Sequence, residues 1–407
     1  MIKHFNIMRS FFIILYLILN SNVQSQSQSS ENIIPGQYIV IIKESNAVPV
    51  VKSGLNTSRS TNQPNKELRD QNINKLKAIQ NRQRLSSSSV LFEYADAIVG
   101  FSARLSDTEV QALRNDPAVE GVYPNIRIQL EQTSGNFKNE NKIFSQVEDC
   151  AVTTSGGHTD GTSKFTWIWI MDTGIDTDHP DLNVQSYSPY AAFFDGSSIE
   201  DFHGHGTHVA GIAAAKDNDI GVVGVSAGAK VVPVKVFADN GIGSLSTLIA
   251  GINHISQYSI SGDVVNMSLA YPESCNQQIA LANAIINLAN AGVWICVAAG
   301  NSSYNTGFVF PACLNSPRVV TVAAIDCQNQ CASFTNLGSS VDWYAVGVDV
   351  YSTYKDGGYS TISGTSMATP VVAGIIHSRA QAPVRGPDIT CQNNAAGITT
   401  KPLAKRQ

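Results

Sequence analysis

The sequence predicts an α/β protein in which helices cover both faces of a parallel sheet, preceded by a smaller α+β domain. In the larger, second part of the chain, short continuous apolar runs alternate with helical patterns, as in parallel sheets buried on both faces. In the first part, strand and helix patterns alternate over about 100 residues, typical of a split βαβ unit. Hydrophobic residues make up 43% of the 407 residues and charged residues only 14%, which indicates a mostly folded chain of two or three domains.

The chain begins with a predicted secretory signal peptide. Basic Lys3 and Arg9 precede an apolar run at residues 11–19, and small residues follow up to an expected cleavage near Ser25. A membrane anchor needs about 20 apolar residues, roughly twice this run, and no second run is long enough. We therefore expect a secreted protein without a stable membrane anchor, with a lysosome or vacuole as the alternative destination.

The smaller domain has five predicted elements. Ser106 followed by Glu109 is a capping-box pattern and marks the start of its second helix. The expected strands are residues 38–42, 97–103 and 119–130, and the expected helices are residues 66–85 and 106–114.

The larger domain has five predicted parallel strands and three predicted helices before the block that contains Ser366. The strands are expected at residues 166–171, 231–237, 264–269, 293–298 and 319–324, and the helices at residues 207–215, 244–257 and 278–291. Ligands of such sheets bind outside the carboxyl ends of the strands. The residues that follow each strand are therefore the candidates for a functional site.

Three multi-residue blocks occupy such element ends. Asp172 directly follows the first strand, His205 opens a helix in the run FHGHGTHVAG, and Ser366 opens another in SGTSMATP. A serine hydroxyl needs a neighbouring base to become a nucleophile at neutral pH, and histidine is a base with a suitable pKa. An aspartate can hold the imidazole in the right tautomer.

These blocks resemble those of the subtilisin family of serine proteases, nearest its proteinase K branch. The chain order Asp, His, Ser is that of subtilisin, and the motifs keep the family's order and usual spacing over residues 164–376. The first part resembles the family's propeptide, notably at residues 38–40 and 100–103. The resemblance implies a subtilisin-like three-layer fold preceded by a ferredoxin-like propeptide domain.

The resemblance also implies a division of the chain and a processing event. We expect a signal peptide at residues 1–25, a propeptide that inhibits and chaperones at 33–133, and a catalytic domain at 134–407. The propeptide is expected to be removed by self-cleavage near residues 132–135. Residues 1–134 carry a net charge of +3 and the rest −8, which favours association of the two parts.

The resemblance assigns roles to four residues. Ser366 is the expected nucleophile, His205 the general base and Asp172 the residue that orients it, while Asn301 is the expected side-chain donor to the oxyanion. For Asn301 the alternatives are a turn residue or a glycan acceptor. An alternative interpretation of the three histidines in the FHGHGTH run, His203, His205 and His208, is that they bind zinc. If they do not, His208 is expected to be a packed structural residue.

The resemblance implies that peptide substrates bind as an extended strand between residues 241–245 and 268–270, with the S1 pocket lined by residues 298–300 and by the second of these segments. Small residues there favour a broad preference for apolar or aromatic P1 side chains. Ala270 and Tyr271 stand where the family usually has glycines, so they are expected to narrow or reshape the cleft. The predicted substrate-binding residues are Gly241, Gly243, Ser268, Leu269, Ala270, Ala298, Ala299 and Gly300.

The resemblance implies no cofactor for the chemistry and a structural calcium site. Pro317, Val319 and Asp342 match positions that bind Ca²⁺ in the proteinase K branch; the alternative is a solvated aspartate. The expected partners are peptide and protein substrates and the chain's own propeptide, and we expect a monomer. The net charge of −5 argues against a nucleic-acid partner.

The cysteines are candidates for disulfides because the chain is expected to be secreted. Cys296 lies in an apolar run and is expected to be a buried free thiol, and Cys327 with Cys331 is the one local pair that we single out. Without Cys296, six cysteines remain, and they allow fifteen pairings: Cys150, Cys275, Cys313, Cys327, Cys331 and Cys391.

The chain departs from the family after its nucleophile. The apolar helix pattern that begins at Ser366 gives way to a polar tail after about residue 377, so we expect a divergent or loosely ordered end. One rival function rests on this departure, namely a catalytically impaired relative that acts as a binding or inhibitory protein. An ester hydrolase is a second rival, although the chain lacks the Gly-x-Ser-x-Gly elbow of α/β-hydrolases.

Overall fold

The computed structural model describes residues 32–43, 66–131, 134–136, 145–185, 188–192 and 198–407. The predicted signal peptide, its cleavage near Ser25 and residues 132–133 of the predicted processing region therefore lie outside the described residues. Within the described ranges, none of the helices combines the length and the apolar character needed to cross a bilayer.

The N-terminal domain folds in the order β-α-β-β-α-β, which is the ferredoxin-like arrangement. Its four strands form an antiparallel sheet in the order β4-β1-β3-β2. Ser106 and Glu109 form the predicted capping box. The prediction missed β2, a five-residue strand that follows a serine-rich turn. The elements are β1 (Ile33–Ile42), α2 (Lys66–Arg82), β2 (Val90–Tyr94), β3 (Gly100–Arg104), α3 (Asp107–Arg114) and β4 (Val119–Gln129).

The second domain is built on a nine-stranded sheet in the order β20-β21-β17-β16-β14-β12-β7-β10-β8. The five predicted strands are neighbours in it and run parallel, which confirms the predicted fold class. They are β7 (Ile168–Asp172), β10 (Val231–Lys235), β12 (Val264–Met267), β14 (Trp294–Ala298) and β16 (Val319–Ile325), joined by β17 (Trp343–Val346) and β8 (Tyr190–Ala191).

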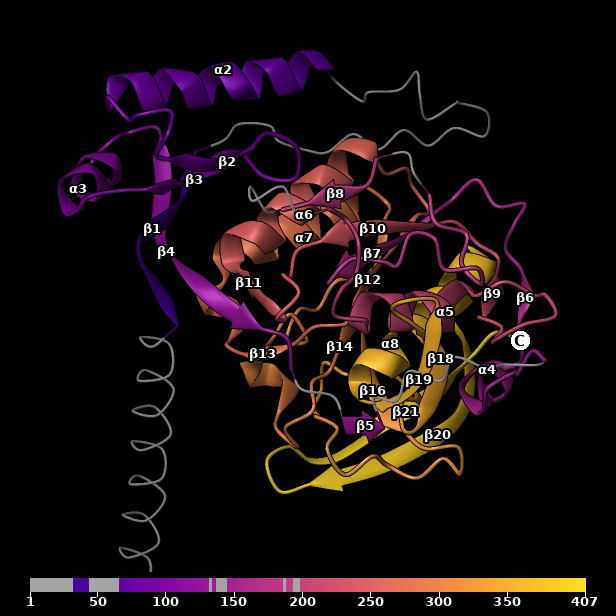
Figure 1. Cartoon of the computed structure of the whole chain (residues 1–407). Helices are drawn as coiled ribbons and strands as arrows, with labels where there is room; N and C mark the ends of the chain where they lie inside the picture. The colour runs from indigo at the N-terminus through magenta and orange to yellow at the C-terminus, as the bar shows by residue number, and fades with distance from the viewer. Residues whose placement is uncertain (1–31, 44–65, 132–133, 137–144, 186–187, 193–197) are drawn as a thin grey trace, which may run out of the picture.

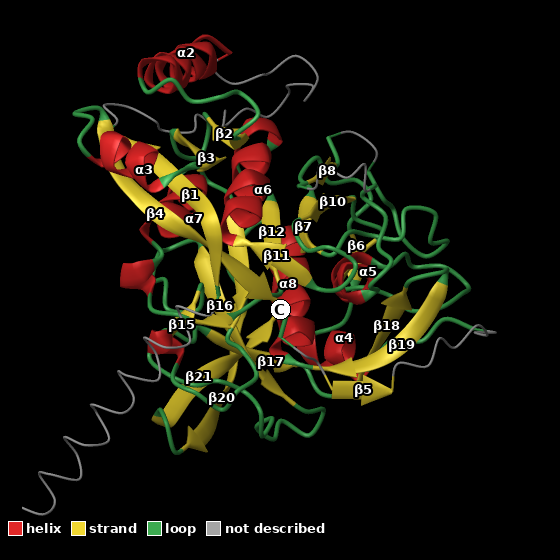
Figure 2. Ribbon diagram, turned by 60° about the vertical axis from the view of Figure 1, so that its left-hand side comes forward, coloured by secondary structure: helices red, strands yellow, loops and turns green. Residues whose placement is uncertain are grey.

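Helices cover both faces of this sheet (Figure 2). Alternate residues of β7 belong to two different cores: Ile168 and Ile170 pack in one, Trp169 and Met171 in the other. This alternation is why the strand reads as a continuous apolar run. The first core contains α4 (Cys150–Ser155), α5 (His205–Ala214) and α8 (Thr365–Arg379), and the second contains α6 (Leu245–Tyr258) and α7 (Ile279–Asn290).

The remaining elements are short connections and small sheets. They are β5 (Ser134–Asn136), β6 (Thr159–Asp160), β9 (Ser226–Ala227), β11 (Ile242–Ser244), β13 (Tyr271–Pro272), β15 (Val309–Phe310), β18 (Val350–Tyr354), β19 (Gly358–Ser363), and the 3-10 helices η1 (Cys275–Gln277) and η2 (Thr306–Phe308).

The expected loosely ordered tail is instead a folded hairpin. Strands β20 (Val384–Asn393) and β21 (Gly397–Lys405) pair antiparallel, and β21 extends the main sheet with Leu403 opposite Tyr344 of β17. Leu403 and Ala404 are buried in the first core, which explains how a mostly polar segment stays attached. Beyond β21, the Arg406 N–H donates to the Ser155 carbonyl at 2.7 Å.

Three disulfides join distant parts of the second domain, and the local pair singled out from the sequence is wrong. Cys327 bonds to Cys150 at the start of α4, and Cys331 bonds to Cys391 of β20, so each partner comes from another element. The third disulfide joins Cys275 to Cys313. Cys296 is the buried free cysteine that the sequence predicts.

Candidate active site

The sheet brings Asp172, His205 and Ser366 together at the carboxyl ends of its strands. Asp172 is the last residue of β7, His205 the first residue of α5 and Ser366 the second residue of α8. His205 Nδ1 lies 2.8 Å from Asp172 Oδ1 and 2.9 Å from Oδ2. All three residues are at most 3% exposed, so this polar contact is shielded from water.

The carboxylate of Asp172 is itself held in place. The Thr173 N–H donates to its Oδ1 at 2.7 Å. Burial lowers the pKa of His205, but the charge of Asp172 and its hydrogen bond outweigh burial, so the net pKa of the imidazole is raised. The pair therefore favours a histidine that can accept a proton.

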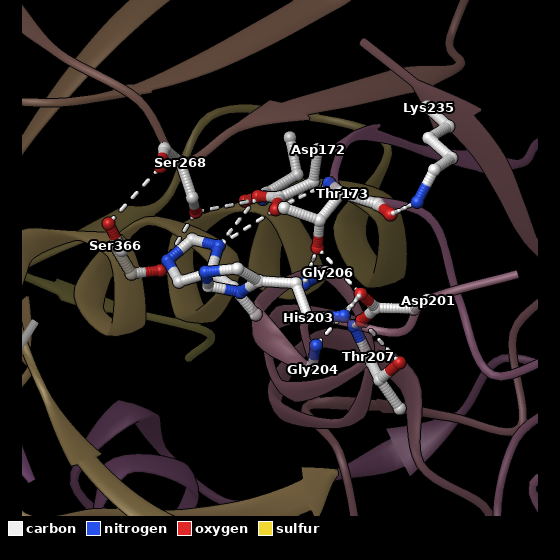
Figure 3. A network of polar contacts seen from close by, with 12 residues as sticks. Asp172, Thr173, Asp201, His203, Gly204, Gly206, Thr207, Lys235, Ser268 and Ser366 are labelled. Carbon is white, nitrogen blue, oxygen red and sulfur yellow. Dashed lines mark hydrogen bonds and ion pairs between the residues drawn. The ribbon is translucent and has the colours of Figure 1, made fainter. Parts of the chain in front are cut away.

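Ser366 faces Ser268 across the site (Figure 3). The Ser366 hydroxyl donates to the Ser268 carbonyl at 3.1 Å, and the Ser268 hydroxyl donates back to the Ser366 carbonyl at 2.8 Å. His205 Nε2 is buried and has no hydrogen-bond partner among the described residues. This nitrogen is on the side of the ring away from Asp172, where a base would accept a proton.

Asn301 presents an unused amide donor at the same edge of the sheet. Its Oδ1 accepts from the N–H and the hydroxyl of Thr365, both at 2.8 Å. Its Nδ2 is buried and unpartnered within the described ranges. Because Thr365 holds the amide oxygen, the orientation of the NH₂ group of Asn301 is fixed as well. A buried Nδ2 also disfavours the glycan alternative for this residue.

The segment at residues 241–245, which is predicted to bind substrate, is paired with a strand of the N-terminal domain. Strand β4 pairs antiparallel with β11, with Gln129 opposite Ile242 and Arg127 opposite Ser244. The Leu130 N–H continues this ladder by donating to the Gly241 carbonyl at 2.9 Å. Figure 1 shows β4 reaching from the small domain into the body of the larger one.

The end of the predicted processing region, where β5 begins, lies against a different element. Strand β5 pairs antiparallel with β19, and Ser134 is opposite Ser363, three residues before Ser366. The backbone on both sides of residues 132–133 is therefore attached to elements that border the Ser366 site.

The residues predicted to line the S1 pocket lie next to each other. Gly300 has φ of +99°, and a Cβ there would come within 2.3 Å of Asn336 Nδ2 and 3.3 Å of the Ala270 Cβ. Ala298, Ala299, Leu269 and Ala270 are buried. The ring of Tyr271 packs against that of Phe310, with centroids 5.6 Å apart and the ring planes tilted by 43°, and Tyr271 is only 7% exposed.

The three histidines of the helix start do not converge on one point. His205 Nδ1 is bonded to Asp172, whereas His208 Nε2 lies 2.9 Å from the Ser360 carbonyl. Burial lowers the pKa of His208 to about 3, so it stays neutral. His208 is the packed structural residue that the sequence predicts.

One candidate metal site comes from the sequence prediction, and a second comes from the structure. Asp342 of the predicted calcium set already accepts the Thr321 N–H on Oδ2 at 2.8 Å, and that set stays a prediction. Among the described residues, one group of carboxylates that could hold an ion has its ligand atoms within 4.8 Å of one another, and it consists of Asp176, Asp178 and Glu200. The sequence reasoning did not single these three out.

Sequence reasoning also missed residues that contact the site. Glu131, just past β4, accepts the Asn301 N–H on Oε2 at 2.7 Å, and burial raises the pKa of its carboxyl. The only sequence signal that could have pointed to Glu131 was its position next to the predicted cleavage region. Asp201 and Thr173 link the segments that carry Asp172 and His205.

A parallel sheet that gathers an aspartate, a histidine and a serine at its carboxyl edge, with an extra domain paired to a strand at that edge, is typical of serine peptidases made as precursors. Residues 163–382 match the Subtilase family, and residues 37–131 match Peptidase inhibitor I9. The chain belongs to the subtilase family and is a serine-type endopeptidase.

Relatives from bacteria and fungi agree with this assignment. The chain is 36% identical to Subtilisin NAT from Bacillus subtilis subsp. natto over 288 residues, 70% of each chain. It is 33% identical to the alkaline serine protease ver112 from Corniculantispora psalliotae over 294 residues, covering 69% of this chain and 72% of that one. A crystal structure of a cold adapted subtilisin-like serine proteinase matches with a TM-score of 0.50 and 29% identity, covering 62% of this chain and 92% of that one.

Proposed function

We propose that this subtilase is a secreted endopeptidase made as a self-processing precursor, with Asp172, His205 and Ser366 as its catalytic triad. The observation that carries the proposal is the buried contact between His205 Nδ1 and both oxygens of Asp172, beside a serine at a helix start. The alternative is a catalytically impaired relative that binds proteins without cleaving them.

The proposed mechanism uses groups of the protein alone. His205 Nε2 takes the proton of the Ser366 hydroxyl as that oxygen attacks the substrate carbonyl, and later gives it to the leaving amine. Asp172 holds the imidazole with Nδ1 protonated and stabilises the imidazolium that forms. To reach Nε2, the Ser366 hydroxyl must exchange its present hydrogen bond to the Ser268 carbonyl for one to His205.

The oxyanion of the tetrahedral intermediate would be stabilised by two kinds of donor. Asn301 Nδ2 supplies one, and the main-chain N–H groups at the start of α8 supply the other, where the helix dipole also favours negative charge. The Asn301 amide costs little to reorganise during the reaction because Thr365 already holds its oxygen.

Substrates would bind as β4 does, as an antiparallel strand along residues 241–245. Main-chain hydrogen bonds then give affinity, and side-chain pockets give preference. The small residues Ala298, Ala299 and Gly300 support an S1 pocket for apolar or aromatic side chains, and the neighbouring Ala270 limits its size. We also propose that the protein is extracellular and monomeric. A structural calcium ion would be held by Pro317, Val319 and Asp342.

Processing would take place in the same cleft. Glu131 and β4 precede the predicted cut near residues 132–135 on the side of β11. Strand β5, which begins at Ser134 within that range, pairs with β19 on the other side. After cleavage β4 would remain paired with β11 and inhibit the enzyme until the N-terminal domain, expected at residues 33–133, leaves the catalytic domain, expected at 134–407.

A serine-directed phosphonylating reagent tests the proposal. The purified, processed protein should lose its activity on a denatured protein substrate at the same rate as it gains one adduct, and peptide mapping should place that adduct on Ser366. A folded, processed protein that cleaves no peptide bond and takes up no adduct would favour the binding alternative. An adduct on another serine would refute the proposed triad.

Replacing Asn301 by alanine is expected to lower kcat by about 100- to 1,000-fold with little change in KM, because the donor acts mainly on the transition state. Steady-state kinetics on a small peptide substrate give both constants. Asn305→Ala, in which the lost side chain only caps η2 by accepting the Gly307 N–H at 2.9 Å, serves as the control. An unchanged kcat in Asn301→Ala would remove this residue from the site.

The affinity of the released N-terminal domain for the enzyme is expected to fall as the pH rises from about 4 to about 6. Burial raises the pKa of Asp96 from 3.8 to about 6, although Arg69 and Asn253 oppose this. The Asp96 loop is buried against α6, where Asn253 Oδ1 accepts from the N–H groups of Ala95 and Asp96 at 3.0 and 2.8 Å. Since the complex prefers the neutral carboxyl, its stability is greatest below about pH 4 and declines above it, by up to about 100-fold in affinity.

The measurement is the inhibition constant of the separate domain against the mature enzyme between pH 4 and 8. The ratio of the constants for wild type and Asp96→Asn cancels every titration that the two share. That ratio should rise across this range and level off above pH 6. A ratio independent of pH would rule out Asp96 as the source.

A further inference from the structure

Asp201 is a second buried carboxylate beside the proposed triad, and both of its oxygens are fully used. Its Oδ1 accepts from the Thr173 hydroxyl at 2.8 Å and from the N–H groups of His203 and Gly204 at 3.1 and 2.8 Å. Its Oδ2 accepts from the N–H and the hydroxyl of Thr207 at 2.8 and 2.6 Å. The residue is 2% exposed. Figure 3 shows Asp201 among the residues that donate to it.

The first link made by Asp201 runs between the segments that carry Asp172 and His205. Thr173 follows Asp172, and its hydroxyl accepts the N–H of Gly206, the residue after His205, at 3.0 Å. A hydroxyl has one proton and a carboxylate can only accept. The Thr173 hydroxyl therefore donates its hydrogen bond to Asp201, which leaves an oxygen lone pair to accept the Gly206 N–H.

The second link follows the same logic one residue further along α5. The Thr207 hydroxyl donates a hydrogen bond to Asp201 and accepts one from the Asp176 N–H at 2.9 Å. The N–H groups of His203, Gly204 and Thr207 also belong to the start of α5, where a negative charge is stabilised. One carboxylate thus fastens the start of α5 to the loop after β7 at two points.

The charge of Asp201 also acts on the imidazole. Burial lowers the pKa of His205, while the charge of Asp172 and, more weakly, that of Asp201 raise it. Other titratable groups around this cluster are His203, His208, Tyr354, Lys355, Asp176 and Lys235; the last of these donates from Nζ to the Thr173 carbonyl. Burial raises the pKa of Tyr354, and the charge of Asp201 raises it further.

We propose that Asp201 is a positioning residue for the peptidase reaction, acting through Thr173 and Thr207 to hold Asp172 and His205 in register and through its charge to favour the imidazolium. The inference rests on the catalytic roles proposed above for Asp172 and His205. Asp201 does not touch the reacting atoms.

Two substitutions separate the geometric effect from the effect of charge. Asp201→Asn removes the charge and one acceptor, and is expected to lower kcat by about 10- to 100-fold with KM little changed, as small misplacements of catalytic groups do. The acidic limb of its kcat/KM pH profile should move to lower pH, because the pKa of His205 falls. Thr173→Val keeps the charge but cuts the first link, so kcat should fall while the acidic limb stays in place.

The matched control is Asp263→Asn. Asp263 is a buried carboxylate that accepts from the Trp167 N–H and Trp169 Nε1 at 2.9 Å each, and it precedes β12, away from the carboxyl edge of the sheet. This variant should lower the thermal midpoint of unfolding and leave kcat and the acidic limb as in the wild type.

Wild-type kcat and an unshifted limb in Asp201→Asn would overturn the proposal, as would effects equal to those of Asp263→Asn. If Asp201→Asn does not fold, Thr173→Val decides, and wild-type kcat in that variant overturns the positioning role. A wild-type protein without peptidase activity would instead overturn the proposed function on which this inference rests.

Discussion

Ser366→Ala is expected to accumulate as the uncut precursor and to show no peptidase activity above background. Loss of a triad nucleophile costs about 10⁶-fold in kcat, because the covalent route is closed. The same serine is proposed to cut the chain near residues 132–135, so the variant should keep its N-terminal domain. Mass spectrometry of the secreted product over time follows both the processing and the new N-terminus.

Ser378→Ala is the control for this experiment. Ser378 lies on the same helix, α8, and its hydroxyl donates only to the Ile375 carbonyl at 2.9 Å. This variant should be processed like the wild type. A mature start upstream of Val119, or an alanine variant at position 366 that is processed at the normal rate in a protease-free host, would contradict self-cleavage by this site.

Asp172→Asn is expected to slow the reaction by about 10⁴-fold while the fold is kept. An asparagine in this place can fill the same volume, but its amide no longer selects the tautomer in which His205 Nδ1 carries the proton. The rate constant of self-processing measures the effect without a need for mature enzyme, because the reaction is intramolecular. Processing within tenfold of the wild-type rate would show that Asp172 does not orient the base.

The fold was predictable where burial alone dictates the sequence. Strands β7, β10, β12, β14 and β16 are apolar on both faces and stood out as continuous runs. Strand β2 is short, and β20 and β21 are mostly exposed on one side, so their composition resembles that of loops. What holds this hairpin is the pairing of Leu403 with Tyr344 and the Cys331–Cys391 disulfide, both contacts between distant residues.

The candidate site was predictable to the extent that its chemistry requires particular side chains in short motifs. Asp172, His205, Ser366 and Asn301 were named from such motifs, and the structure brings them to one edge of the sheet. Asp201 was not named, because its importance comes from five hydrogen bonds that exist only once α5 packs beside β7. Spacing along the chain does not reveal such a contact.

The hairpin of β20 and β21 also sets the order of events during synthesis. Strand β21 is the last part of the main sheet to leave the ribosome, yet it lies beside β17, and Lys405 and Arg406 donate to the carbonyls of Thr154 and Ser155 at α4. The N-terminal domain, which is made first, can fold long before then, since domains fold in the order in which they are translated. If the N-terminal domain inhibits the enzyme as proposed, the inhibitor would be folded before the main sheet of the peptidase is complete.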